Sequence, residues 1–369
     1  MTTPGGDADD RNGKASIELQ IAREVPGRAV LARPDGTIFI GRGYDIHSSS
    51  DDGSSWELVG SLPRSPLRRV VGVSRLACRL LRQEVRALAQ LSEGRLVAAN
   101  REGLFHGLPG EGMMAPCRVE DGIEDGSPHY MPPMRLEVGP QDVVIWGEYG
   151  ATRPTRAIRL FASSDGGESF GVVHTFRPEE IGHIHNLIYD PGLDHYWVLA
   201  GDHGSEPGIG MLSADLERFE WLVKGEQRYR AVEVFDFGDC LIYATDTEME
   251  TNALVSLDKK SGRTEKLRQF EGSCIYACRF GSLFALTTTV EPSRANFSRE
   301  ATLWLSRNGE DWRCALRTPK DRWHADYFQF GSLVLPAGAS DREVILVSGQ
   351  AVEGLDGRCA VAHVAPEAW

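Results

Sequence analysis

Short runs of apolar residues recur along the chain at intervals of about 40 to 50 residues. Each run ends at a turn rich in Gly, Asp or Asn and is followed by a second apolar run. This pattern predicts pairs of buried or half-buried β-strands. We expect seven such pairs, at residues 28–32 and 37–40, 86–90 and 95–99, 134–138 and 143–146, 185–189 and 195–199, 230–234 and 240–244, 276–280 and 283–287, and 326–330 and 333–336.

Repetition of a strand pair followed by an outer hairpin predicts an all-β fold, a single β-propeller over residues 16–369 with seven blades of four-stranded antiparallel sheets. Residues 17–21 alternate between apolar and polar, and we expect them to pair with the last blade and close the ring. Residues 74–85 fit either a short helix or an outer strand, so six blades plus an insertion is the alternative. Residues 1–15 are polar and acidic, which predicts a disordered tail.

Composition limits the function only loosely. The hydrophobic fraction of 41% and the charged fraction of 25% are those of an ordinary soluble domain, and the net charge of -13 argues against a general nucleic-acid binder. The sequence shows no apolar run of the ~18 residues that a membrane span needs, and no signal peptide, so we expect a cytoplasmic protein without a membrane partner. The seven cysteines include no CxxC pair, which favours buried reduced thiols over disulfides or a thiol nucleophile.

One phrase, Ser-x-Asp-x-Gly-x-Ser-aromatic, occurs at residues 49–56 and again at 163–170. A third copy at 306–312 is one residue shorter and has Asn308 in place of Asp. The phrase predicts a hairpin turn in which the Asp and Ser side chains bind local backbone and Gly takes a positive φ. It resembles the Asp-box, or BNR repeat, of sialidase-like β-propellers, and this resemblance implies the propeller scaffold more than any particular activity.

The first strand of each propeller blade lines the central channel, so equivalent positions of different units should converge in space. The start of these strands holds three arginines, whose guanidinium groups suit a carboxylate or phosphate ligand. We predict a substrate-binding set of Arg28, Arg86, Arg230, His203 and Asp326. Ion pairs with neighbouring carboxylates are the structural alternative. The same position holds Met134, with Arg135 beside it, and His185 and Tyr276.

The ends of the second strands hold carboxylates in three successive units, at Glu148, Asp202 and Asp246. A glycosidase needs a proton donor and a second carboxylate or base across the bond that it breaks. We therefore predict a catalytic set of Glu148, Asp202, Asp246, His185 and Tyr276. Oxygen ligands of a metal ion, or Asp and Glu residues that merely cap turns, are the alternatives.

His183 and His185 lie two residues apart, so on a strand both imidazoles face the same side. Together with His203 of the next loop they form a candidate site for a divalent metal ion. The alternative is a hydrogen-bonded pair that binds no metal, in which case His185 or His203 could serve as a general base.

The resemblance also has functional implications. Sialidases hold a substrate carboxylate with three arginines and use a tyrosine nucleophile, and residues 27–37 loosely resemble the Arg-Ile-Pro segment that opens their propeller, with Ala29-Val30 in place of Ile-Pro. Metal-dependent propeller lyases that act on uronic acids use histidines around the channel. The implied function is a glycoside hydrolase or lyase whose partner is an acidic sugar or oligosaccharide. A non-catalytic binding or scaffold propeller is the alternative.

Overall fold

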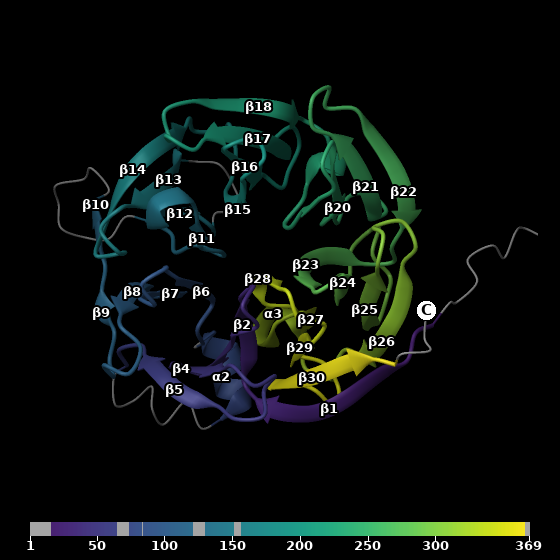
Figure 1. Cartoon of the computed structure of the whole chain (residues 1–369). Coiled ribbons are helices and arrows are strands. Elements are labelled where there is room, and N and C mark those ends of the chain that lie inside the picture. Colours follow the sequence, from purple (N-terminus) through teal and green to yellow (C-terminus); the bar gives the residue numbers. More distant parts are fainter. Residues whose placement is uncertain (1–15, 65–73, 83, 121–129, 151–155, 366–369) are drawn as a thin grey trace, which may run out of the picture.

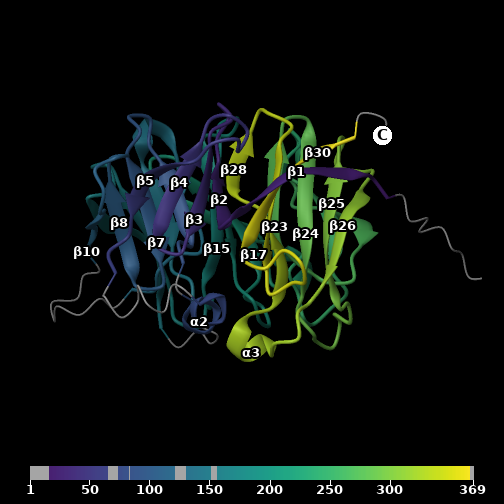
Figure 2. The same cartoon turned by 90° about the horizontal axis from the view of Figure 1, so that it is seen from below.

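The computed structural model describes residues 16–64, 74–82, 84–120, 130–150 and 156–365. Its strands form sheets that stand around a common centre, as the view along the central axis shows (Figure 1). Within the described residues only two short α-helices occur, α2 (Arg75–Leu81) and α3 (Ala325–Phe328), and both lie on one face of the ring (Figure 2). The predicted all-β, propeller-type architecture is therefore confirmed at this level.

Four sheets of the described chain are separate and follow one another along the sequence. In each, consecutive strands pair antiparallel, which is the arrangement that short turns between apolar runs predict, except that β10 pairs in parallel with β14. The strands of these sheets are β6 (Ala87–Gln90), β7 (Leu96–Asn100), β8 (Gly103–Gly107) and β9 (Ala115–Pro116); β10 (Arg118–Glu120), β11 (Glu137–Val138), β12 (Val144–Gly147), β13 (Ile158–Ser163) and β14 (Ser169–Phe176); β15 (Ile184–Asp190), β16 (His195–Ala200), β17 (Gly208–Ser213) and β18 (Phe219–Lys224); and β19 (Phe235–Asp236), β20 (Cys240–Ala244), β21 (Ala253–Asp258) and β22 (Thr264–Gln269).

The other described strands form one 13-stranded sheet. The short strand β28 pairs in parallel with both β2 and β23, and β24 pairs with β27, so hydrogen bonding runs without a break through this region. The strand path therefore does not divide it into independent blades, and the blade number stays a prediction. Its strands are β1 (Leu19–Pro26), β2 (Arg28–Ala32), β3 (Ile38–Arg42), β4 (Asp45–Ser49), β5 (Glu57–Ser61), β23 (Ser273–Phe280), β24 (Leu283–Val290), β25 (Glu300–Ser306), β26 (Arg313–Pro319), β27 (Gly331–Val334), β28 (Ala337–Ser340), β29 (Ile345–Gln350) and β30 (Arg358–Val364).

The two ends of the described chain lie side by side (Figure 1). Strand β1 pairs antiparallel with β30, from Leu19 opposite Val364 to Pro26 opposite Arg358. The prediction that the N-terminal strand closes the ring against the last unit is confirmed. This pairing covers an edge of β30 that would otherwise present unpaired backbone groups to solvent.

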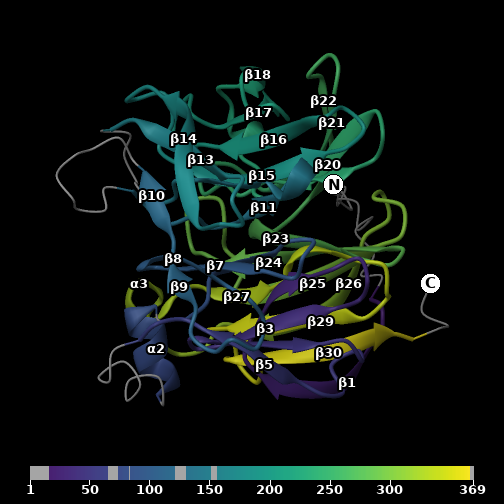
Figure 3. The ribbon, with the colours of Figure 1, turned by 60° about the vertical axis from the view of Figure 1, so that its left-hand side comes forward.

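Within the ambiguous segment 74–85, Arg75–Leu81 form helix α2 and not an outer strand. The side chain of Ser74 accepts a hydrogen bond from the Ala77 N–H at its start, and Arg82 takes a left-handed conformation at its end. The side chain of Arg79 is only 1% exposed and pairs with Asp321 and Asp356, so α2 is joined to the last part of the chain. Figure 3 shows α2 beside α3.

The prediction for the last unit was wrong. Residues 326–330 do not form an inner strand, because His324 caps helix α3 and the chain reaches a strand only at Gly331. The first two strands of this unit are β27 and β29 instead, and they pair with each other. Apolar Tyr, Phe and Phe at 327, 328 and 330 imitated a strand although Gln329 takes a φ of 69°, which a strand does not allow.

The predicted hairpin turns have the expected internal hydrogen bonds. In the second copy, the Ser163 hydroxyl donates to Asp165 at 2.8 Å and accepts from the Gly167 N–H at 2.9 Å, while Asp165 also accepts from the Ser169 N–H. Residues 49–55 repeat these contacts, and all three copies join the third and fourth strands of a unit. Residues 213–218, with a bond from Ser213 to Asp215, form a fourth related turn that the sequence pattern missed.

The interior consists of apolar clusters packed between neighbouring sheets. Strand β7 is buried along its whole length because its sheet is covered on both faces. All seven cysteines are free thiols, as expected. Among the described residues, no helix combines the length and apolar character of a membrane-spanning segment.

Candidate functional site

A cavity of about 610 Å³ lies where the first strands of several units begin and their second strands end. Residues of at least five units line this cavity. Such a shared lining is expected if equivalent positions of different units converge in space. A second cavity, of about 620 Å³, is lined by residues of β22, β25 and β26 but by none of the predicted site residues. The central cavity is therefore the candidate functional site. The lining of the central cavity is Arg28, Arg82, Glu84, Arg86, Arg101, Met131, Pro132, Met134, Arg135, Tyr149, Gly150, His185, Asp202, Arg230, Val232, Asp246, Ile275, Tyr276, Gln329 and Gln350.

Seven predicted site residues line this cavity together although they span almost 250 positions of sequence. They comprise the three arginines of the substrate-binding set, two of the three carboxylates and both other catalytic candidates. In order, they are Arg28, Arg86, His185, Asp202, Arg230, Asp246 and Tyr276. The strand alignment therefore brought the correct faces of these units together.

Glu148 is absent from the cavity lining. Its side chain is fully buried, and its carboxylate accepts from Arg156 and Arg159 and from the N–H of Met131. The next residue, Tyr149, points into the cavity instead. Neighbouring side chains on a strand face opposite sides, so an alignment that is wrong by one residue selects the wrong side chain. In this unit the predicted residue was Glu148 and the observed lining residue is Tyr149.

His203 and Asp326 also lie outside the cavity lining. The His203 side chain is 46% exposed and its Nδ1 lies 3.7 Å from Glu248. Asp326 belongs to helix α3 and its side chain is 75% exposed. The chain thus places both side chains at the surface and outside the cavity lining.

One side of the cavity combines arginines with a tyrosine. The Arg28 guanidinium donates to the Tyr276 hydroxyl at 3.3 Å and pairs with Glu84 at 3.2 Å. The Arg135 guanidinium lies over the same tyrosine ring, 5.2 Å from its centre, and its Nε donates to Glu233 at 2.9 Å. The Tyr276 side chain is therefore in contact with two positive charges.

Arg86 differs from the other inward-facing arginines. Its guanidinium lies over the Tyr149 ring at 4.7 Å, and among the described residues its side chain has no carboxylate partner. Burial lowers the pKa of Arg86, and the nearby charges of Arg28 and Arg135 add to this, yet an arginine stays protonated at neutral pH. Arg86 thus presents a positive charge to the cavity that no carboxylate of the described residues neutralises.

The opposite side centres on Asp202. Its carboxylate lies 3.3 Å from Nε2 of His183, 2.9 Å from Nε2 of His185 and 3.0 Å from Nε of Arg230. Burial tends to raise the pKa of Asp202, but hydrogen bonds from the two histidines outweigh it and hold the pKa well below its usual range. Nδ1 of His185 faces the Ala231 carbonyl at 2.8 Å, so both ring nitrogens of His185 are engaged.

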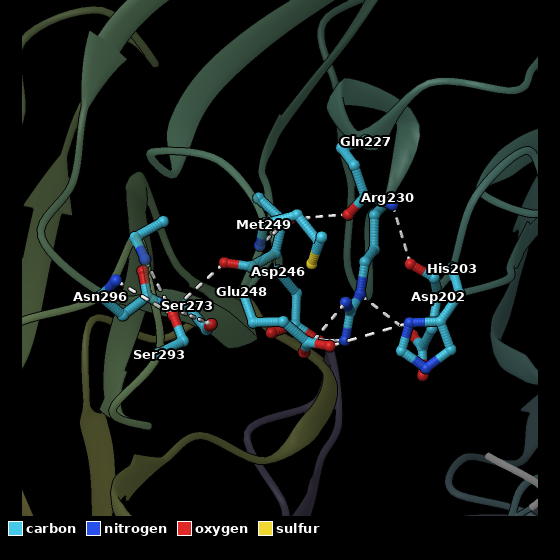
Figure 4. A network of polar contacts seen from close by, with 12 residues as sticks. Asp202, His203, Gln227, Arg230, Asp246, Glu248, Met249, Ser273, Ser293 and Asn296 are labelled. Atoms are coloured by element: carbon cyan, nitrogen blue, oxygen red, sulfur yellow. Dashed lines mark hydrogen bonds and ion pairs between the residues drawn. The ribbon is translucent and has the colours of Figure 1, made fainter.

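Arg230 joins this carboxylate to two others (Figure 4). Its guanidinium lies 3.7 Å from Asp246 and 3.3 Å from Glu248, in addition to Asp202. Burial raises the pKa of Asp246; Arg230 opposes this shift and the charge of Asp202 adds to it. Glu291, which interacts electrostatically with the same groups, has its pKa raised to about 7, first by burial and then by Asp246.

The residues present give a partial fit to the predicted metal site. Ligand atoms of His183, His185 and Asp202 all lie within 4.8 Å of one another. Two imidazoles and one carboxylate are a donor set that divalent transition metals accept. His203 is not part of this group, and Arg230 already contacts the carboxylate, so the third ligand differs from the predicted one.

Several lining residues were absent from the predicted set. Arg135 lies beside the aligned Met134, and Tyr149 beside Glu148, so the signal in both cases was an adjacent polar residue one position out of register. Glu84, Arg82 and Arg101 come from segments outside the aligned strands, where no repeat could indicate them. The lining holds six arginines against three carboxylates, so it is positive on a protein whose net charge is -13.

No sequence-family model matches this chain, and no curated protein matches it. Solved structures do resemble it. A chain in the crystal structure of the mitotic checkpoint complex matches with a TM-score of 0.56 at 8% identity, over 99% of this chain and 97% of that one. The extracellular domain of a one-component system from B. thetaiotaomicron matches with a TM-score of 0.55 at 11% identity, over 94% of this chain and 43% of that one.

The GH74 enzyme of Niastella koreensis matches with a TM-score of 0.48 at 12% identity, over 80% of this chain and 46% of that one. This chain thus spans less than half of two of these three proteins. Likenesses at such low identity concern the fold and carry no activity with them. The comparisons therefore support a β-propeller-type fold for this chain.

Proposed function

We propose that the central cavity binds a carboxylate-bearing sugar and that the protein acts on it as a glycoside hydrolase or a lyase. The observation that carries this proposal is Arg86, a cation in the cavity wall without a carboxylate partner among the described residues. A desolvated guanidinium is stabilised by a planar anion that accepts two parallel hydrogen bonds. The positive lining supports an anionic ligand in general, and Arg86 supplies the point at which it attaches.

The other two predicted arginines are less suited to this role. Arg230 lies between Asp202, Asp246 and Glu248, so its charge is already compensated. Arg28 pairs with Glu84 and donates to Tyr276. The structural alternative of ion pairing thus applies to Arg230 and Arg28. We therefore assign the substrate carboxylate to Arg86, with Arg28 and Arg135 adding positive charge nearby.

Within this proposal, elimination has more support than hydrolysis. A lyase removes the proton next to the carboxylate, the bond to the leaving oxygen breaks as a double bond forms, and that oxygen takes up a proton. Tyr276, whose hydroxyl accepts from Arg28 and whose ring lies beneath Arg135, is placed in the cavity wall to accept the first proton. Asp246, whose pKa burial raises, could supply the second. Asp202 is poorly suited to hydrolysis because His183, His185 and Arg230 already engage its carboxylate.

The scaffold is part of the same proposal. The strands group as seven units of four if β27, β29, β30 and β1 form the last blade, and we propose this count. The repeated turn between third and fourth strands supports a relationship to sialidase-like propellers.

The proposal for the metal is narrower: His183, His185 and Asp202 would hold a divalent ion, which would add positive charge opposite Arg86.

Ligand binding to a variant of Arg86 tests the function. Arg86→Gln should lower the affinity for galacturonate, glucuronate or sialate at least tenfold, because it removes the charge that pairs with the carboxylate. Arg177→Gln is the matched control, since the Arg177 side chain is 92% exposed. Titration calorimetry with each acid and with neutral galactose measures both. If none of the acids binds the unaltered protein, the proposal is wrong and the scaffold alternative gains support.

Product analysis separates the two reactions. Elimination creates a carbon–carbon double bond conjugated with a carboxylate, which absorbs in the ultraviolet, whereas hydrolysis creates only a new reducing end. Incubation with uronate oligomers, with and without chelator, measures both products and the dependence on metal. Binding without either product would make this a sensor or binding propeller and would overturn the enzymatic part of the proposal.

A further inference from the structure

Several exposed apolar side chains lie close in sequence to residues that line the central cavity. Four of the large hydrophobic residues that stand out into solvent lie within three positions of a residue that lines it: Leu80 and Leu81 precede Arg82, Met249 follows Asp246, and Tyr327 precedes Gln329. A fifth, Phe297, is 80% exposed, more than any other large hydrophobic among the described residues. Soluble proteins seldom keep such residues together at a concave site unless they contact a ligand or partner.

The loop that carries Phe297 is fixed against the cavity wall. The Asn296 side chain donates to the Thr247 carbonyl at 3.1 Å and to the Ser273 hydroxyl at 3.0 Å, and accepts from Asn252 at 2.8 Å. Ser273 begins strand β23, which carries Ile275 and Tyr276 of the cavity lining. Figure 4 shows Asn296 beside Ser273. The neighbouring Phe297 is therefore held in place at its backbone although its ring faces solvent.

The loop after β20 is fixed in the same way. The Met249 N–H donates to the Thr247 hydroxyl at 3.0 Å, and the Thr247 N–H donates to the side-chain Oδ1 of Asn252 at 2.8 Å. Asn252 is completely buried and also bonds Asn296, so the two loops share one polar network. Met249 is 57% exposed above it. A rigid backbone that presents exposed apolar side chains loses little entropy when a ligand covers them.

We propose that Met249, Phe297 and Tyr327 form an apolar rim that binds further units of an acidic oligosaccharide whose terminal carboxylate lies in the cavity. This inference rests on the proposed function and adds that the substrate is an oligomer. Sugar rings carry flat faces of C–H groups that pack on aromatic rings and thioethers, while their hydroxyl groups stay in water. The cavity supplies the charged contacts to the sugar, and the rim supplies apolar contacts. Met249 and Tyr327 lie within three residues of the arginine-rich cavity lining in sequence, which favours an acidic sugar chain over a separate protein.

The test is the dependence of affinity on chain length. Calorimetry with galacturonate oligomers of one to four residues, and in parallel with sialate oligomers, compares the unaltered protein with Phe297→Ala and Tyr327→Ala. In the unaltered protein, affinity should rise with length. Each alanine variant should lose roughly 3- to 10-fold for the longer oligomers and nothing for the monomer. Phe297→Trp should restore the gain, and Leu58→Ala, which changes a 57% exposed residue of β5, should leave it unchanged.

The outcomes separate the rim from the cavity. If the monomer binds and longer oligomers bind no more tightly, the rim inference is wrong and the proposed function stands. If the alanine variants weaken the monomer as much as the oligomers, or if Leu58→Ala does the same, the rim is not a subsite. If no length of either acid binds the unaltered protein, the proposed function fails and the rim inference fails with it.

Discussion

Asp202 and Asp246 occupy equivalent positions in successive units, yet their surroundings move their pKa values in opposite directions. Asp202 lies 3.3 Å and 2.9 Å from two imidazole nitrogens and forms an ion pair with Arg230, and these contacts stabilise its charge in spite of burial. Asp246 is just as enclosed, but it shares Arg230 with Asp202 and Glu248, and its Oδ1 accepts no hydrogen bond among the described residues. Two carboxyl groups whose surroundings move their pKa values apart are the arrangement that acid–base chemistry needs.

Glu137 gives a prediction at the same scale. Burial raises its pKa from 4.5 to about 8, and the charge of Glu233 adds to this shift. The folded state therefore keeps a proton that the unfolded chain releases above about pH 4.5, so the contribution of Glu137 to stability falls as pH rises from about 4.5 to about 8. Glu137→Gln should make this fall smaller, because glutamine does not titrate and can still accept from the Tyr189 N–H.

Urea unfolding of the unaltered protein and of Glu137→Gln at pH 5 and pH 8 measures the effect. The difference in unfolding free energy between the two pH values should be smaller in the variant. Glu93→Gln is the control, since that side chain is 58% exposed, and it should preserve the original difference. An unchanged pH dependence in Glu137→Gln would contradict the assignment.

At the scale of elements, the repeated turn shows how a local phrase fixes a hairpin. The Ser163 hydroxyl donates to Asp165 and accepts from the Gly167 N–H, so it satisfies a buried backbone donor inside the turn. Gly167 takes a φ of 81°, and a Cβ there would lie 2.4 Å from Val97 of the neighbouring sheet. The phrase thus encodes both the turn and its contact with the sheet beside it.

A matched pair of substitutions tests this within one turn. Ser163→Ala should cost about 1–3 kcal/mol of unfolding free energy, because it leaves the buried Gly167 N–H without an acceptor. Ser169→Ala changes an exposed hydroxyl that bonds the same Asp165, and it should cost less than about 1 kcal/mol, because water can replace the lost bond. Denaturant unfolding measures both values. Equal costs would show that the buried hydroxyl has no special role.

At the scale of the whole molecule, stability depends on the pairing of the two chain ends. Strand β1 is mostly exposed, so it adds little apolar burial, and its contribution is the ladder of hydrogen bonds with β30. A protein that begins at residue 27 should unfold at a lower temperature and should self-associate, because the edge of β30 is then free. Glu24→Ala removes only the exposed ion pair with Arg358 and should change stability by less than about 1 kcal/mol.

Thermal unfolding and size-exclusion chromatography of both proteins check this. The shortened protein should melt several degrees lower and elute in part as larger species, whereas Glu24→Ala should behave as the unaltered protein does. A shortened protein that keeps its melting temperature and elutes as a monomer would contradict the role of β1 in closing the ring.

The sequence by itself determined the features that depend on neighbouring residues. The apolar runs specified most inner strands, and the repeated Ser, Asp and Gly specified the hairpin turns, because backbone hydrogen bonds and local sterics act over a few positions. The predicted strands 134–138 and 230–234 were wrong in extent: the first is reduced to Glu137–Val138, and the second is replaced by Phe235–Asp236. The repeat also brought Arg28, Arg86, His185, Asp202, Arg230, Asp246 and Tyr276 to one cavity.

Tertiary structure decided the rest, for a physical reason. Whether Glu148 or Tyr149 faces the cavity depends on a register of one residue, which Arg156 and Arg159 determine by enclosing the carboxylate. Asp326 lies on a helix because α3 packs against α2, more than 240 positions earlier in the chain. That Arg86 lacks a carboxylate partner among the described residues, while Arg230 has three, follows only from which units become neighbours in space.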